Sequence, residues 1–211
     1  MMAREFYEKT ERLKQKQEEI RRKEKEYGGK IEQPSKKEIE ENKKQWLDEI
    51  KSGKNHDPAF KAYQDALALK NAIQAVYDQD LIHQPETEQA ATRLLSKLNI
   101  AIKKWEKAAL DNVEIVKVNP GMFKDNVFYV ESNRVDTALM NRELTTDCVN
   151  GVQAERNLLM KDPGFWNQIA QKINDFLAEY NIGPLFNVDK THYGIEDKIE
   201  EGMDKFDPRP M

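Results

Sequence analysis

The residues best suited to nucleophilic chemistry in this chain are its one cysteine, Cys148, and the histidine His192. A thiolate attacks electrophilic centres, and an imidazole can take the thiol proton while Asp147 or Asp189 orients the ring. No motif around Cys148 marks it as a nucleophile, and a neighbouring carboxylate such as Asp147 raises a thiol pKa. The pattern is more typical of a buried helix cysteine and a surface-loop histidine, so a cysteine-dependent enzyme is the alternative rather than the main hypothesis.

Metal and cofactor chemistry have no support in the residue pattern. The three histidines, His56, His83 and His192, are far apart, and the sequence contains no HExxH or Cys/His pairing. It also contains no GxGxxG, GxxxxGK[ST] or GxSxG motif. Paired acidic residues are numerous and typical of solvated helix faces. We therefore expect no metal site and no cofactor, and a non-enzymatic role is favoured.

A more specific pattern lies near the N-terminus, where four apolar residues recur every seven positions: Phe6, Leu13, Ile20 and Tyr27. On a helix this spacing places them along one line. The second apolar position of each heptad is polar instead, with Thr10, Gln17 and Glu24. A stable two-stranded coiled coil normally fills both positions, so the pattern predicts a weak or partner-dependent association with another protein or a second copy.

Trp46 is the other candidate contact, because the segment around it is otherwise strongly polar. It either docks the N-terminal region onto the rest of the chain or contacts a partner, and tryptophan is enriched at interface hot spots. The predicted partner-binding residues are therefore Phe6, Leu13, Ile20, Tyr27 and Trp46. Trp105 and Trp166 lie on wider apolar stripes and are predicted to be core residues.

The first 55 residues are predicted to form a charged helical arm. Residues 3–27 have helical spacing and end at Gly28-Gly29, as helices commonly do. Ser35 and Glu38 form a capping box for a second helix, which Ser52-Gly53 ends. Charges of both signs are frequent here and large apolar residues are few.

Beyond residue 56 the apolar stripes become wide enough to face a core. Asp57-Pro58 and Asp162-Pro163 are helix-start signals, and Thr87 is expected to cap the helix after Pro85. A further helix is predicted from about 146 to 160. The β-branched segments 113–118 and 127–130 flank Asn119-Pro120-Gly121, which predicts a β-hairpin; a helix over 127–141 is the competing interpretation.

The predicted fold class is mainly α, with a helical-bundle body, one short β-hairpin and an N-terminal long-helix arm resembling a coiled-coil strand. The predicted divisions are an arm over 1–55, a body over 56–185 with the hairpin near 113–131, and an acidic tail over 186–211.

Composition excludes several classes of function. The net charge is -4, and the largest basic cluster, residues 21–25, is interleaved with glutamates, so nucleic-acid binding is not expected. No apolar run approaches the roughly 20 residues of a membrane span, and the N-terminus has no signal-peptide core. A single cysteine fits a reducing compartment. We expect a cytoplasmic protein or one exported without a signal peptide.

An acidic stretch near the C-terminus contains Glu196, Asp197, Glu200 and Glu201. It resembles the glutamate-rich signal near the C-terminus of substrates of the Dot/Icm type IV secretion system, which often lack a signal peptide and carry coiled-coil segments. The resemblance implies a bacterial effector that is secreted into a host cell and binds a host protein, and it implies no activity. A solvated acidic helix explains the same residues.

The leading hypothesis is a non-enzymatic helical protein–protein interaction module. The alternatives are a cysteine-dependent enzyme using Cys148 and His192, and a non-catalytic fragment of a larger protein. The doubled methionine at the start and the proline-rich end are compatible with a fragment.

Overall fold

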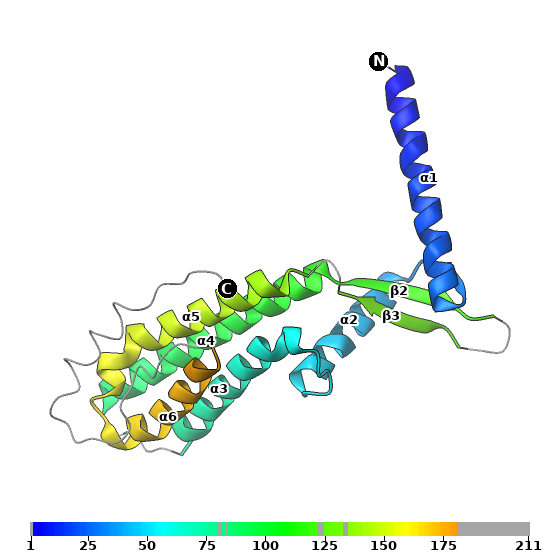
Figure 1. Ribbon diagram of the computed structural model, residues 1–211. Helices are drawn as coiled ribbons and strands as arrows, with labels where there is room; N and C mark the ends of the chain where they lie inside the picture. The colour runs from blue at the N-terminus through cyan, green and yellow to red at the C-terminus, as the bar shows by residue number, and fades with distance from the viewer. Residues whose placement is uncertain (1, 80–81, 83, 122–124, 133–134, 181–211) are drawn as a thin grey trace. The chain divides into compact units, whose positions relative to one another are not determined.

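The fold is mainly α, as predicted, in a computed structural model that describes residues 2–79, 82, 84–121, 125–132 and 135–180 (Figure 1). For residues 2–10 only the backbone is described. The elements run in the order α1 (Met2–Tyr27), β1 (Lys30–Glu32), α2 (Lys36–Lys51), the 3₁₀ helix η1 (Pro58–Phe60), α3 (Lys61–Tyr77), α4 (Pro85–Asn112), β2 (Glu114–Asn119), β3 (Val127–Glu131), α5 (Thr137–Leu159) and α6 (Pro163–Glu179). The predicted hairpin is confirmed as β2 and β3, whereas β1 was not expected.

The chain forms two compact units, each of which is built from two stretches of sequence. We call them the sheet unit, Met1–Glu49 with Ala109–Val135, and the bundle unit, Ile50–Ala108 with Asp136–Met211. The predicted boundaries placed the hairpin in the body, but the structure groups it with the N-terminal helices. The reason is that β1, which follows α1 directly, pairs with β2.

The sheet is antiparallel with the strand order β1-β2-β3. Ile31 lies opposite Val118, and Val116 lies opposite Tyr129. The central strand is covered on both faces, since Val116 and Val118 point to one face, Ile115 points to the other, and all three are buried. Strand β2 is rich in β-branched residues, which is why the sequence identified it.

Short-range signals determine where α1 ends and α2 begins. Gly28 has φ of 69°, a left-handed conformation that suits glycine after a helix. The capping box at α2 is confirmed: Ser35 N donates to Glu38 Oε2 at 2.7 Å, and Glu38 N donates to Ser35 Oγ at 3.3 Å.

The bundle unit is held by an apolar core among α3, α4, α5 and α6, and α3 packs against both α5 and α6. The predicted core residues Trp105 and Trp166 are buried. The Tyr63 ring stacks on Trp105 with centroids 4.3 Å apart. Asn141 accepts from Trp105 Nε1 at 3.0 Å and donates to the Ala59 carbonyl at 2.8 Å, so the buried indole N–H is satisfied.

A buried carboxylate also joins α4 to α5 in this unit. Glu155 accepts from Arg93 Nε at 2.9 Å and from Lys97 Nζ at 2.6 Å. Burial raises the pKa of Glu155, but the hydrogen bonds from Lys97 and Arg93 outweigh it and leave that pKa below its usual value. The charge is compensated, which is the condition under which a buried carboxylate is tolerated.

Two predicted helix starts were wrong. Thr87 does not cap α4, which begins at Pro85; the threonine is fully buried and its Oγ1 donates to the Leu158 carbonyl at 2.9 Å. The helix expected from 146 begins upstream at Thr137, capped by the Asp136 side chain, which accepts from Leu139 N at 3.0 Å. The competing helical interpretation of 127–141 therefore holds only for its last residues.

Gly28 and Gly29 make a matched pair for testing how closely α1 and β1 approach the hairpin. A Cβ on Gly29 would lie 2.6 Å from Val118 Cγ1 and 2.7 Å from the Asn119 carbonyl oxygen, whereas a Cβ on Gly28 meets nothing within 4 Å. We expect Gly28→Ala to cost about 1 kcal/mol because of its positive φ. Gly29→Ala should cost about 2–3 kcal/mol because backbone must move.

Hydrogen exchange of the β2 amides in the two variants measures this difference. Equal protection in both variants would contradict the close contact between Gly29 and β2.

Candidate partner-binding surface

The last turn of α1 is fixed to the hairpin by an aromatic contact. The Tyr27 ring stacks on the Tyr129 ring, with centroids 4.3 Å apart and planes inclined by 19°. The Tyr27 hydroxyl donates to Glu131 Oε1 at 2.8 Å. The structure therefore gives this member of the heptad line a partner inside its own chain.

The other oxygen of Glu131 completes the attachment. Lys23, one turn before Tyr27, donates from Nζ to Glu131 Oε2 at 2.8 Å. The side chains of Lys23 and Glu131 are only 13% and 16% exposed, so solvent screens this pair less than a surface pair. Burial lowers the pKa of Lys23, but the hydrogen bond to Glu131 and nearby carboxylates outweigh it and raise that pKa above its usual value.

The ionisation of Tyr27 is coupled to the same contact. Burial, followed by the hydrogen bond to Glu131 and the charge of that carboxylate, raises the pKa of Tyr27 from 10.0 to about 12. The neutral phenol is the form that donates to Glu131, so the contact favours protonated Tyr27.

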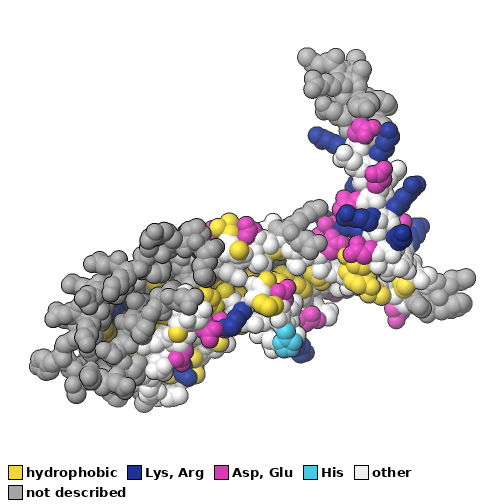
Figure 2. Space-filling model, in the orientation of Figure 1, with side chains coloured by type: hydrophobic (Ala, Val, Ile, Leu, Met, Phe, Trp, Pro, Cys, Tyr) yellow, Lys and Arg dark blue, Asp and Glu magenta, His cyan; other side chains and the backbone are white. Residues whose placement is uncertain are grey.

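Before Tyr27, the described side chains of the heptad line are those of Leu13 and Ile20, and both reach solvent. Leu13 is 55% exposed, and Ile20 is partly exposed. Figure 2 shows charged side chains of both signs along the described part of α1. The side chain of Phe6 is not among those that the structure describes, so the predicted role of Phe6 stays a prediction.

Trp46 differs from the other predicted contact residues. Only 6% of it is exposed, and the next residue, Leu47, is buried to the same extent. The burial favours the interpretation in which Trp46 packs within its own chain.

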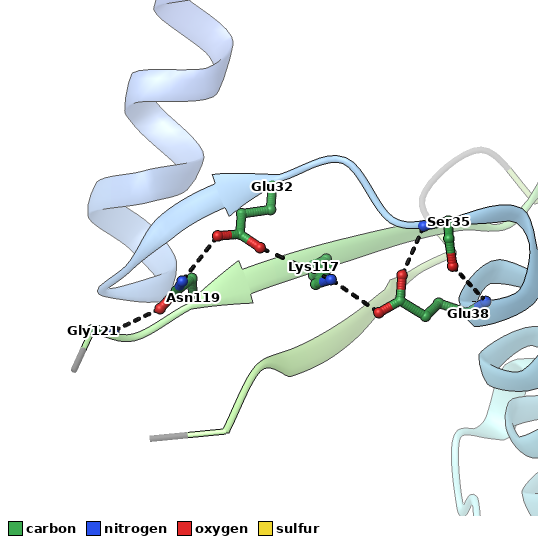
Figure 3. A network of polar contacts seen from close by, with 6 residues as sticks. All are labelled: Glu32, Ser35, Glu38, Lys117, Asn119 and Gly121. Carbon is green, nitrogen blue, oxygen red and sulfur yellow. Dashed lines mark hydrogen bonds and ion pairs between the residues drawn. The ribbon is translucent and has the colours of Figure 1, made fainter. Parts of the chain in front are cut away.

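A polar network positions α2 on the face of the sheet opposite to Tyr129 (Figure 3). Lys117 Nζ donates to Glu38 Oε1 at 2.9 Å and lies 3.9 Å from Glu32 Oε2. Asn119 Nδ2 donates to Glu32 Oε1 at 2.9 Å. The hydrogen bonds from Lys117 and from Ser35 lower the pKa of Glu38 to about 2. One carboxylate thus closes the α2 capping box and ties α2 to β2.

The cysteine expected as the alternative nucleophile is inaccessible. Cys148 has no exposed surface, and burial together with the charge of Asp147 raises the pKa of its thiol to about 12. Its predicted base, His192, lies outside the described residues. Across the described ranges, no group of three or more His, Cys, Asp or Glu side chains could hold a metal ion.

Comparison with known proteins found no match to this chain. No protein-family description, no curated protein and no solved structure matches the chain. In the part of the chain that the structure describes, no helix has the length and apolarity needed to cross a membrane. A function is therefore proposed from the residues of the chain itself.

Tyr129 and Glu131 are residues of the candidate site that sequence reasoning missed. They anchor α1, yet they lie about a hundred positions after it, and no local pattern links the two segments. The sequence did predict the β-hairpin that carries both residues, but it did not indicate which helix packs against that hairpin.

Replacing Tyr27 by phenylalanine tests the attachment of α1. The variant keeps the ring stack but loses the hydrogen bond to Glu131, and we expect a loss of about 1–2 kcal/mol in the stability of the sheet unit at pH 8. Because the folded-state pKa of Tyr27 is raised, the stabilisation is complete below pH 10 and disappears as the pH rises toward 12.

Urea unfolding followed by circular dichroism at pH 8, 10 and 12 measures the difference between the two proteins. Tyr77→Phe is the control, since the Tyr77 hydroxyl is exposed and lies 3.3 Å from Thr92 Oγ1 in the bundle unit. A difference that does not change between pH 10 and pH 12 would exclude the Tyr27–Glu131 contact.

Alkylation tests the state of Cys148. We expect iodoacetamide to leave the folded protein unmodified at pH 8, because the thiol is buried and protonated. In urea the same cysteine should react completely within the time course of a free thiol. Rapid modification of the folded protein, detected by mass spectrometry, would restore the cysteine-dependent enzyme as a hypothesis.

Proposed function

We propose that this protein is a non-enzymatic interaction module that binds another protein through the exposed face of α1. The observation that carries the proposal is the 55% exposure of Leu13 on a helix whose last turn is bonded to the hairpin. The helix is thus attached at one end, while two residues of its apolar line, Leu13 and Ile20, still face solvent.

Attachment makes binding by such a helix more favourable. Helices in proteins take most of their stability from packing, so a free peptide of this sequence must be ordered when it binds. Fixing the last turn through Tyr27 and Lys23 reduces the conformational entropy that association removes. Docking of an amphipathic helix into a complementary surface is a common mode of protein recognition.

The competing hypotheses have less support. Cys148 is buried and its thiol is protonated at neutral pH, which disfavours a cysteine-dependent enzyme. Export into a host cell, with a host protein as the partner, follows only from the resemblance of residues 196–201 to a secretion signal. Those residues lie outside the described part of the chain, and the proposed interaction does not depend on them.

Affinity capture with matched variants tests the proposed interaction. The test variant is Leu13→Glu with Ile20→Glu, which places two negative charges on the apolar line. The control is Gln15→Glu with Arg22→Gln, which changes the net charge equally on the opposite side of α1. We expect a partner that the wild-type and control proteins bind and the test variant does not.

The captured protein must then be purified and its dissociation constant measured by calorimetry. A partner whose affinity falls at least tenfold with the test variant, and less than twofold with the control, supports the proposal. Equal affinity for all three proteins would move the interaction away from α1, and a wild-type homodimer abolished by the test variant would replace the outside partner with a second copy.

A further inference from the structure

Basic side chains surround the exposed apolar line of α1. Lys16 follows Leu13 by three residues and precedes Ile20 by four, so it lies between them on the helix surface. Arg12 and Arg21 lie on its two sides, within about 100° of the line at 3.6 residues per turn. All three basic side chains are exposed.

The acidic residues of the same segment lie elsewhere on the helix. Glu11, Glu18, Glu19 and Glu26 are about 120–160° from Leu13 around the axis, and Glu19 Oε1 lies 3.7 Å from Lys23 Nζ. Glu24 is close to the line, but its Oε1 accepts from Ile31 N at 3.3 Å and so takes part in the attachment to β1. The exposed line therefore lies on a basic face, although the charges of the whole segment are nearly balanced.

This basic face is not neutralised within the part of the chain that the structure describes. Lys23 pairs with Glu131 and lies 3.7 Å from Glu19, and Lys14 lies 3.1 Å from Glu11, but no ion pair joins Arg12, Lys16 or Arg21 to a carboxylate whose side chain the structure describes. The basic charge that the attachment of α1 uses is separate from the basic charge beside Leu13 and Ile20.

We propose that the partner presents an acidic amphipathic helix to this face, a specification that rests on the proposed function. Its apolar residues contact Leu13 and Ile20, and its Asp or Glu side chains flank them and pair with Arg12, Lys16 and Arg21. Oppositely charged residues beside an apolar seam determine partner choice and orientation in paired helices.

The same charges disfavour the two other occupants of the face. A second copy aligned on Leu13 and Ile20 would place Lys16 and Arg21 near identical cations, which is destabilising. An anionic membrane would accept the cations, but helices that lie in a membrane interface bury a broad apolar face. Among the described side chains of this line, Leu13 and Ile20 alone are not attached to the sheet, and two residues do not make a broad apolar face.

Binding of designed helical peptides to the intact protein tests the inference. The probe is a fluorescein-labelled peptide with Leu at both apolar heptad positions and Glu at the flanking positions, and its control carries Lys at the flanking positions. Fluorescence anisotropy should show at least tenfold tighter binding of the Glu peptide, and its affinity should fall as the salt concentration rises.

Two protein variants with equal charge changes locate the site. Lys16→Gln with Arg21→Gln removes cations beside the line, and we expect it to weaken binding of the Glu peptide about tenfold. Arg22→Gln with Lys25→Gln removes cations farther from the line and should change the affinity less than twofold.

Other results would overturn the inference. These are equal affinity for both peptides, no binding of the Glu peptide, binding only to phosphatidylserine vesicles, or a homodimer lost on Leu13→Glu. A captured partner that requires Leu13 and Ile20 but binds the Lys16→Gln, Arg21→Gln variant normally would leave the proposed function intact and remove the acidic helix. Failure of the Leu13→Glu, Ile20→Glu variant to alter any partner would instead remove the proposed function.

Discussion

The two oxygens of the Glu131 carboxylate accept hydrogen bonds from Tyr27 and Lys23, which lie one turn apart at the end of α1. The site is partly buried, so these bonds are less screened than those between exposed charges. Stacking of Tyr27 on Tyr129 adds an apolar contact at the same place. This attachment makes α1 part of a folded unit, and the proposed role of its exposed face depends on it.

The hairpin can hold α1 because other parts of the chain pack against both of its faces and keep it folded. On the face away from Tyr27, Lys117 joins β2 to Glu38 at the start of α2. Gly29 permits β1 to approach Val118 closely, and β1 adds the third strand. A two-stranded hairpin alone is marginal in water, whereas three strands covered by helices can persist.

Local patterns predicted those parts of the fold that local physics determines. The sequence predicted the capping box of Ser35 and Glu38, the glycine after α1 and the β-branched strand β2, because each of these signals acts within a few residues. Strand β1 was not readable, because three residues carry too little pattern and its partner lies far along the chain. Thr87 was misread as a cap because its hydroxyl bonds across to Leu158 rather than within its own helix.

The candidate site was predicted in part. The heptad pattern identified the line but treated its members as equivalent, whereas the structure attaches Tyr27 to the sheet and exposes Leu13. This difference arises from the contacts that Tyr129 and Glu131 make with α1. The spacing of residues in the N-terminal segment does not predict these contacts. Trp46 was identified by residue type, and its burial depends on packing that type alone cannot show.

The central claim is that α1 is held at its last turn and is open to a partner before it. Hydrogen exchange of the intact protein, resolved along α1 by mass spectrometry, tests this claim most directly. The account predicts slow exchange in residues 23–27 and in β2, and fast exchange in residues 11–20, because an unsupported helical segment frays in water. Exchange in residues 11–20 as slow as in β2 would show that this face is already covered, and would contradict the account.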